Sequence, residues 1–267
     1  MPKTKNIIAE LPQSETVEPR AVLDLWRSGG TDLVCVLGPT ASGKTRYAVG
    51  LARAIQDCPG GPRCEIISAD SRQIFRGMDI GTGKDLSEYG DIPYHLIDIA
   101  DPGEPYNVHR YQQDFRAAAE DIRSRGALPI LCGGTGLYIN AVTSASYSFD
   151  GQRRPLSGGA DYGTTFFIGT LVSREVRNAR IDARLDARLQ EGLVEEIRGL
   201  LEKGVGAQTL IAYGLEYKFV TQYVLGELDF GQMRGLLATA IHQFAKRQMT
   251  WVRGMERSGA TVHWVQP

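Results

Sequence analysis

The chain has 267 residues and a mass of 29.3 kDa, which suits one large α/β domain or one domain with a small appendage. Apolar residues make up 42% and charged residues 23%, so a packed core is expected, and a disordered or collagen-like chain is excluded. The 30 basic residues nearly balance the 31 acidic residues, which excludes a strongly basic nucleic-acid-coating protein but not a local basic stripe.

The first 31 residues are polar and have no clear period. We expect a loosely packed N-terminal extension over 1–31, with a short helix near Ala21–Trp26, followed by a core over 32–267. The sequence shows neither a signal peptide nor the run of ~20 apolar residues that spans a membrane. We therefore expect a cytoplasmic protein with no membrane partner, in which the four cysteines are free thiols.

Short apolar segments alternate with helical segments from residue 33 onward. The first, Leu33–Leu37, is a continuous apolar run, as in buried parallel strands. One helix is expected after Thr45 and through Ile55, and another over Asn107–Ser124. The alternation predicts an α/β fold, a parallel sheet flanked by helices with right-handed crossovers. Its further strands are predicted at Cys64–Ser68, Tyr94–Ile99, Leu128–Cys132, Thr165–Val172 and Thr261–Val265.

The alternation stops at a Gly/Ser-rich stretch, 144–164, which we predict to be a flexible loop. Residues 173–257 are mainly helical and basic. A long amphipathic helix is expected from Ser173 to Leu200, with two more over Gly214–Leu225 and Phe230–Arg253. By its spacing, the first of these helices places four arginines on one face, which by itself is typical of a solvated surface: Arg177, Arg180, Arg184 and Arg188.

The segment Gly38–Thr45 (GPTASGKT) matches GxxxxGK[ST] in full and lies between a strand and a helix. It is a P-loop, so the sheet is expected to be P-loop NTPase-like. Backbone N–H groups of such a loop surround phosphate oxygens, the lysine adds a point charge, and the last hydroxyl can hold Mg²⁺. The expected phosphate-binding residues are Gly38, Thr40, Ala41, Ser42, Gly43, Lys44 and Thr45, with Thr45 as the metal ligand.

An ATPase or kinase is the first expectation for a P-loop. Such enzymes commonly end a later strand in an acidic residue that holds Mg²⁺, whereas the strand 128–132 ends in Cys132. Asp98 does end another predicted strand. The pattern therefore leaves open both a nucleotide and a diphosphate leaving group.

Two further polar residues follow predicted strands. Asp70 comes after the second strand, and Thr135 follows two glycines after the strand 128–132. Ligands of open parallel sheets collect at the carboxyl ends of strands, so both are candidates for a shared site; an Asp turn and a threonine N-cap are the alternatives. The four histidines have no metal-ligand spacing and are expected to be structural.

Several blocks together resemble the tRNA dimethylallyltransferases, also called isopentenyl-diphosphate:tRNA transferases. The P-loop is followed by DSRQIFRGMDIGT at 70–82, which is similar to the family pattern DSxQ-(V/I)-(Y/F)-x-G-x-DIGT. YHLIDIADPGEP at 94–105, GGTGLY at 133–138 and AKRQMTWVR at 245–253 resemble further family blocks, in the same order. The five linked motifs are far more specific than a P-loop alone.

The resemblance implies transfer of a dimethylallyl group from dimethylallyl diphosphate to the N6 amine of an adenine in the tRNA anticodon loop, with release of diphosphate. It implies that Asp70 is the base and that Thr135 lies near the reacting centre. It also implies that Arg180 or Arg184 contacts the diphosphate, which Lys44, Thr45 and Mg²⁺ also bind.

The implied partners are tRNA, bound through its anticodon stem-loop, and dimethylallyl diphosphate. The adenine has to leave its stack to reach such a site. Ser71, Arg72 and Gln73 lie next to Asp70 in the sequence and are candidates to contact the adenine. Basic residues of the last helix are candidates for the tRNA backbone, namely Lys246, Arg247 and Arg253, and so is the arginine row from Arg177 to Arg188. We expect a monomer.

The chain departs from the family pattern in two places. Residues 144–164 stand where the family has a helical insertion that grips the anticodon stem-loop. A family GY block is also altered, to IAYGLEY at 211–217. Three alternatives therefore stay open: a prenyltransferase that uses a free adenine nucleotide, a degenerate nucleotide- or diphosphate-binding paralogue, and an ordinary P-loop kinase.

Overall fold

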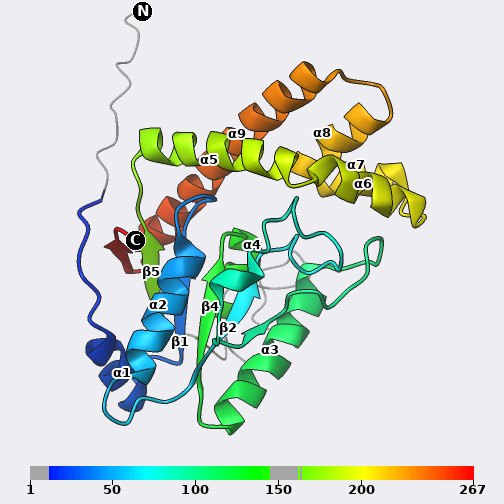
Figure 1. Ribbon diagram of the computed structural model, residues 1–267. Helices are drawn as coiled ribbons and strands as arrows, with labels where there is room; N and C mark the ends of the chain where they lie inside the picture. Colours follow the sequence, from blue (N-terminus) through cyan, green and yellow to red (C-terminus); the bar gives the residue numbers. More distant parts are fainter. Residues whose placement is uncertain (1–11, 145–161, 163) are drawn as a thin grey trace, which may run out of the picture.

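The computed structural model describes residues 12–144, 162 and 164–267, and the strands in these residues form one six-stranded parallel sheet in the order β3-β2-β4-β1-β5-β6 (Figure 1). The strands are β1 Leu33–Leu37, β2 Cys64–Ala69, β3 Tyr94–His95, β4 Leu128–Gly133, β5 Thr165–Thr170 and β6 Val262–Val265. The helices are α1 Pro19–Arg27, α2 Lys44–Gln56, the 3₁₀ helix η1 Leu86–Glu88, α3 Val108–Ser124, α4 Gly136–Thr143, α5 Arg174–Gln190, α6 Leu193–Glu202, α7 Ala207–Tyr213, α8 Leu215–Val224 and α9 Phe230–Arg257.

The central strands are buried on both faces, because helices cover both sides of the sheet. In β1, Val34 and Val36 point into the core under α1 and α2, while Leu33, Cys35 and Leu37 point into the core under α3 and the C-terminal helices. This explains the continuous apolar run of β1, because a strand with one solvent-exposed face would alternate apolar and polar residues. The predicted P-loop NTPase-like α/β fold with a helical C-terminal region is confirmed.

The strand register brings three loops to one edge of the sheet. Leu37 and Ala69, the last residues of β1 and β2, both pair with Gly133 at the end of β4. The P-loop and the segments after β2 and β4 therefore start at the same level. Helices α5 and α9 lie across this edge of the sheet (Figure 1), so the carboxyl ends of the strands face the helical region.

The N-terminal extension is better packed than expected in its described part, 12–31. Val22 and Leu23 are 1% and 0% exposed, in the core that α1 shares with α2. The expectation of loose packing is thus wrong for α1, since these two apolar side chains pack in the core beside α2. Residues 1–11 lie outside the described residues, as do 145–161 and 163 of the predicted flexible loop.

Two predicted elements differ in extent. The strand expected at Tyr94–Ile99 is limited to Tyr94–His95, because Leu96 and Asp98 have the left-handed φ values of 61° and 57°, which a strand excludes. The long helix expected from Ser173 to Leu200 is two helices, α5 and α6, separated at Gly192, whose φ is 103°. Helix α7 was not predicted.

Candidate functional site

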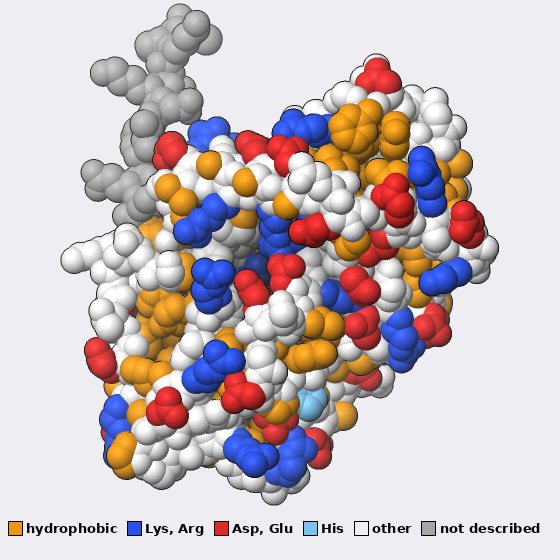
Figure 2. Space-filling view, viewed as in Figure 1, with side chains coloured by type: hydrophobic (Ala, Val, Ile, Leu, Met, Phe, Trp, Pro, Cys, Tyr) orange, Lys and Arg blue, Asp and Glu red, His pale blue; other side chains and the backbone are white. Residues whose placement is uncertain are grey.

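The P-loop forms one wall of a cavity of about 390 Å³ at the carboxyl ends of the strands. Residues of the loop that line the cavity are Thr40, Ala41, Gly43, Lys44 and Thr45. In the space-filling view, basic and acidic side chains surround a hollow beneath α5 (Figure 2).

Two residues of the P-loop, Gly38 and Ser42, face the sheet and shape the loop. The Ser42 hydroxyl donates to the carbonyl of Pro39 at 2.8 Å and lies 2.6 Å from the hydroxyl of Thr170 on β5. A Cβ on Gly38 would stand 2.1 Å from the Thr170 hydroxyl oxygen. These two expected phosphate-binding residues therefore hold the loop against the sheet and do not line the cavity.

Lys44 is the first residue of α2 and is half-buried at the wall of the cavity. This burial lowers the pKa of Lys44, although the neighbouring Asp70 acts in the opposite direction. Cys132 lies beside it at the end of β4, and burial raises the pKa of the Cys132 thiol to about 12. The end of β4 therefore presents a neutral thiol, at the position where many P-loop NTPases have an acidic Mg²⁺ ligand.

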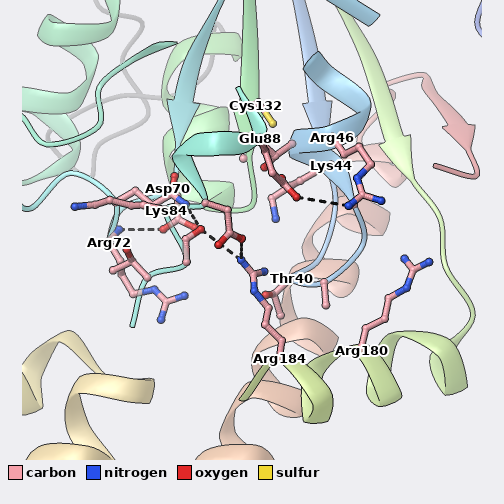
Figure 3. A pocket seen from close by; sticks show the side chains of 18 of the residues that line it. Thr40, Lys44, Arg46, Asp70, Arg72, Lys84, Glu88, Cys132, Arg180 and Arg184 are labelled. Atoms are coloured by element: carbon pink, nitrogen blue, oxygen red, sulfur yellow. Dashed lines mark hydrogen bonds and ion pairs between the residues drawn. The ribbon is translucent and has the colours of Figure 1, made fainter. Parts of the chain in front are cut away.

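Asp70 follows β2 and lines the same cavity, opposite Lys44 (Figure 3). Its Oδ1 accepts the N–H of Arg72 at 3.0 Å, which closes a tight turn and fixes the carboxylate. Thr135 supports this turn from β4: its hydroxyl oxygen accepts the N–H of Ser71 at 3.0 Å. Asp70 is thus anchored at the level of the P-loop.

Thr135 itself lines a second cavity, of about 480 Å³. Ser71 and Arg247 line this cavity too, with the aromatic side chains of Tyr213, Phe244 and Trp251. Three residues line both cavities: Arg72, Phe244 and Gln248. The two cavities therefore adjoin one another at these side chains.

The arginine row of α5 is divided by the fold. Arg180, Arg184 and Arg188 line the first cavity, and Arg177 does not. Arg184 pairs with Asp85, while burial lowers the pKa of Arg188 to about 10, with Arg184 acting in the same direction. The sequence analysis considered Arg188 only as part of the arginine row for the tRNA backbone and not for the diphosphate, although its spacing with Arg180 and Arg184 was a signal that it shares their cavity.

Gln248 is a site residue that the sequence candidates omitted. Its Oε1 accepts the N–H of Thr40 at 2.8 Å, and its Nε2 donates to the carbonyl of Gly134 at 3.0 Å. One buried side chain of α9 thus joins the P-loop to the turn after β4. The residue stands inside the AKRQMTWVR block, which was the available signal.

The remaining basic candidates of α9 separate from one another. Arg247 lines the second cavity, whereas Lys246 and Arg253 line neither cavity. Gln73 lines the first cavity, where its amide nitrogen donates to the carbonyl of Gly83 at 3.2 Å.

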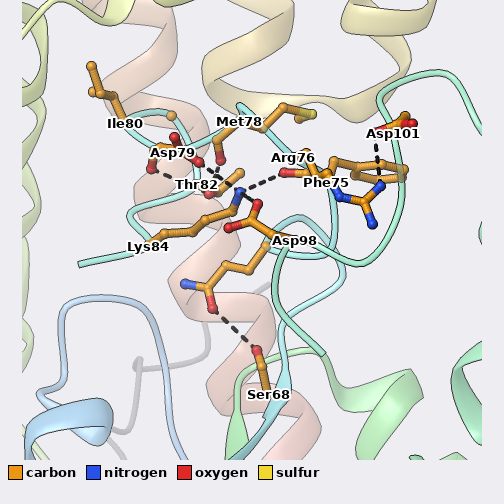
Figure 4. Close-up of polar contacts among 12 residues, drawn as sticks. Ser68, Phe75, Arg76, Met78, Asp79, Ile80, Thr82, Lys84, Asp98 and Asp101 are labelled. Carbon is orange, nitrogen blue, oxygen red and sulfur yellow. Dashed lines mark hydrogen bonds and ion pairs between the residues drawn. The ribbon is translucent and has the colours of Figure 1, made fainter. Parts of the chain in front are cut away.

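The loop after β2 is stabilised by a buried lysine (Figure 4). Lys84 is 4% exposed; it donates to the carbonyl of Phe75 at 2.6 Å and to Asp79 at 2.8 Å, and it also pairs with Asp98. Asp98, which the sequence left open as a Mg²⁺ ligand, is therefore a counter-ion of Lys84 and lines neither cavity. This network holds the segment 82–85 against the first cavity.

In the described part of the chain, no three His, Cys, Asp or Glu side chains come close enough to hold a metal ion. Thr45 lines the first cavity, and Mg²⁺ commonly takes one or two protein ligands together with phosphate oxygens and water. The site therefore fits a Mg²⁺ ion that arrives with a phosphorylated ligand. Among the described helices, none is long and apolar enough for a membrane span.

Comparison with known proteins agrees with this geometry. The family model for IPP transferase matches residues 73–157 and 144–255. tRNA dimethylallyltransferase 1 of Parabacteroides distasonis is 44% identical, and the match covers 88% of this chain and 92% of that protein. tRNA dimethylallyltransferase 2 of Bacteroides fragilis gives the same identity and coverage.

Solved structures show the same fold. The tRNA isopentenylpyrophosphate transferase of Bacillus halodurans has a TM-score of 0.73 and 31% identity, and the match covers 88% of this chain and 89% of that one. The Staphylococcus epidermidis transferase has a TM-score of 0.74 and 28% identity, over 88% and 92% of the two chains. With its P-loop, its two adjoining cavities and these relatives, the chain belongs to the IPP transferase family.

Proposed function

We propose that this protein transfers a dimethylallyl group from dimethylallyl diphosphate to the N6 amine of an adenine in the anticodon loop of tRNA. The observation that carries the proposal is the pair of adjoining cavities. One has a P-loop, Lys44 and three arginines, as a diphosphate site needs, and the other has aromatic walls, as a base needs. Asp70 lies in the first cavity, one residue before Ser71 of the second.

In this reaction the N6 nitrogen attacks C1 of the donor, the C1–O bond breaks, and its electron pair leaves with the diphosphate. The N6 amine is a weak nucleophile because its lone pair is delocalised into the ring. Asp70 accepts the proton that the nitrogen loses. Thr135 holds the turn that carries Asp70, so we assign it a positioning role.

The departing diphosphate gains negative charge, which the cations of the first cavity stabilise. Lys44 contributes a point charge, and the planar guanidinium groups of Arg180 and Arg184 can each donate to two phosphate oxygens. Backbone N–H groups of the P-loop complete the set. Mg²⁺, held by Thr45 and the diphosphate, would neutralise further charge on the leaving group.

We assign the acceptor side to the second cavity, where Ser71, Arg72 and Arg247 contact the extruded nucleotide, while Gln73 supports the boundary between the cavities. Lys246 and Arg253 would contact the tRNA backbone outside it. The relatives named above are tRNA dimethylallyltransferases, which supports tRNA over a free nucleotide as the acceptor. One chain contains both cavities, so we propose that a monomer is sufficient.

The domain boundaries follow from the same assignment. The core is 32–267, and 173–257 supplies the tRNA-contacting helices. The two segments matched by the family model meet at 144–157, and the alignment with the Parabacteroides relative extends over 289 positions while using 88% of 267 residues. This supports 144–164 as a short replacement for a longer segment of the relatives.

The test is a transfer assay with purified protein, Mg²⁺ and radiolabelled dimethylallyl diphosphate, offered unmodified tRNA, an anticodon stem-loop or AMP in separate reactions. We expect label in tRNA. Label in AMP alone would move the protein to the small-acceptor class. If no acceptor is labelled while diphosphate still binds, the proposed transferase activity is wrong.

A further inference from the structure

A buried carboxylate lies behind the boundary between the two cavities. Glu216, the second residue of α8, is 2% exposed and lines neither cavity. Its Oε2 accepts a hydrogen bond from Arg72 Nη1 at 2.6 Å, and its Oε1 accepts one from Arg188 Nη1 at 3.3 Å. One carboxylate therefore holds two guanidinium groups that come from different parts of the chain.

Both partners of Glu216 belong to the site. Arg188 lines the first cavity, and Arg72 lines both. The guanidinium carbon of Arg72 also lies 5.5 Å from the centre of the Phe244 ring, another wall that the cavities share. The side chain of Arg72 therefore forms part of the boundary between the proposed diphosphate cavity and the proposed adenine cavity.

Without Glu216, the acidic residue nearest to Arg72 in the sequence is Asp70. The Oδ1 of Asp70 already accepts the backbone N–H of Arg72. A buried arginine that loses its counter-ion is costly, so its side chain turns toward the next available anion. An ion pair between Arg72 and Asp70 would stabilise the ionised carboxylate and make it a weaker base. Glu216, which lines neither cavity, can thus affect the reaction by holding Arg72 away from Asp70.

We infer that Glu216 is a positioning residue: it keeps the Arg72 guanidinium at the boundary of the cavities and away from Asp70, and it anchors Arg188 in the first cavity. This inference rests on the proposed function. Glu216 stands in the IAYGLEY block and Arg72 in DSRQ, so the contact joins two of the sequence blocks.

The experiment compares Glu216→Gln with the parent protein by two readouts. The first is kcat and KM for prenyl transfer, and the second is calorimetric binding of inorganic diphosphate, which needs no acceptor. We expect kcat to fall about tenfold or more, as for residues coupled in one ion-pair network. Diphosphate is expected to bind more tightly, because the variant removes one negative charge beside two arginines that face the ligand.

A double-mutant cycle shows whether the effect acts through Arg72. Adding Glu216→Gln to Arg72→Gln is expected to lower kcat much less than Glu216→Gln does in the parent, because only the contact with Arg188 is then left to lose. Glu216→Asp, which keeps the charge, is expected to recover part of the kcat. The matched control is Glu65→Gln. Glu65 is also a buried carboxylate shared by two partners, Arg125 and His95, but it lies at the opposite end of β2 from Asp70. Its variant should lose stability and keep kcat and diphosphate affinity.

The inference is overturned if Glu216→Gln changes only the thermal midpoint, as Glu65→Gln does, or if its effect on kcat adds in full to that of Arg72→Gln. Should Glu216→Gln not fold, Glu216→Asp decides the question, and a parental kcat in that variant would contradict the inference. A parent protein without transfer activity would refute the proposed function, while the diphosphate titration would still report on Glu216.

Discussion

At the scale of single residues, the site depends on how a few polar groups are held. Asp70 is anchored through its own turn, and Thr135 holds the next residue, Ser71. Gln248 does the same for the P-loop, because its amide satisfies one backbone group on each of two loops. The reacting groups are therefore prearranged before a ligand binds, which reduces the cost of orienting them.

Asp70→Asn tests the base directly. The amide keeps the size of the side chain and removes its ability to take a proton, so transfer to tRNA is expected to fall by about 10²–10⁴-fold. Diphosphate should still bind, since Lys44 and the arginines remain. Steady-state transfer and calorimetric titration with diphosphate check the two expectations. Asp91→Asn, at an exposed ion pair with Arg53, is the control; near-parental transfer by Asp70→Asn would disprove the proton-acceptor role.

Gln248→Leu tests the bridge between the loops. The variant leaves the Thr40 N–H and the Gly134 carbonyl without their partner, at an expected cost of about 1–3 kcal/mol in the free energy of unfolding. We also expect weaker diphosphate binding, since Thr40 lines the first cavity. Urea unfolding and calorimetry measure the two effects. Gln222→Leu removes an exposed contact with Glu227 and should change neither; equal behaviour of the two variants would contradict the bridging role.

At the scale of elements, the two ends of β2 have separate tasks. Its carboxyl end leads to Asp70 and the site, while its amino end holds Glu65, paired with His95 and with Arg125 after α3. Burial would raise the pKa of Glu65, but hydrogen bonds from His95 and Arg125 outweigh burial and leave the pKa lowered. The two ion pairs of Glu65 therefore connect β2 to β3 and to the end of α3, and they lie away from the cavities.

The lowered pKa of Glu65 predicts a pH dependence of stability. A carboxyl group whose pKa is lower in the folded than in the unfolded protein stabilises the fold above the unfolded value, about 4.3 for glutamate. That contribution is lost as the pH falls through the folded pKa. The parent protein is thus expected to exceed Glu65→Gln in free energy of unfolding at pH 7, and the difference should shrink in acid. Denaturant unfolding at a series of pH values measures it; a difference that stays constant down to pH 3 would contradict this assignment.

Helix α6 shows how a break in a helix places a side chain. Gly192 ends the run from α5, and α6 then directs Glu196 toward the loop after β2. Glu196 accepts the N–H groups of Asp79, Ile80 and Gly81 at 2.8, 2.6 and 3.1 Å and the hydroxyl of Tyr217 at 2.7 Å. The uninterrupted helix expected from the apolar stripe would not have this change of direction.

At the scale of the whole molecule, a net charge of −1 conceals a sorted distribution. Lys44, Arg72, Arg180 and Arg184 lie at one cavity together with acidic side chains (Figure 3). Arg188 lines the same cavity, while α9 carries basic residues outside it. Such sorting lets a nearly neutral protein attract polyanions to one edge of its sheet.

Substitution of α9 lysine and arginine tests the tRNA-binding proposal. Lys246→Ala and Arg253→Ala are each expected to weaken tRNA binding and to reduce the slope of log affinity against log salt by about 0.7–0.9. Diphosphate affinity should be unaffected, since neither residue lines the first cavity. Filter binding over a range of salt concentrations measures the slope. Arg20→Ala on α1, where Arg20 pairs with Asp24, is the control, and a slope equal to that control would remove the residue from the interface.

The sequence alone determined the α/β class, the P-loop and the strand-end positions of Asp70 and Thr135. Apolar runs and glycine-containing loops are local patterns, and parallel strands bring their carboxyl ends to one edge whatever their order. Linked motifs added the family, which the comparisons then confirmed. Local pattern also located most helices, although it extended the strand at Tyr94 too far.

Only the tertiary structure decided which residues meet. It separated Arg177 from the other arginines of α5, added Arg188 and Gln248 to the site, moved Asp98 away from it to Lys84, and set Glu216 behind Arg72, 144 residues away in the chain. These pairings depend on how α5, α8 and α9 cross the edge of the sheet. No local periodicity encodes that crossing, because the burial of a charged side chain is settled by its partner and not by its neighbours in sequence.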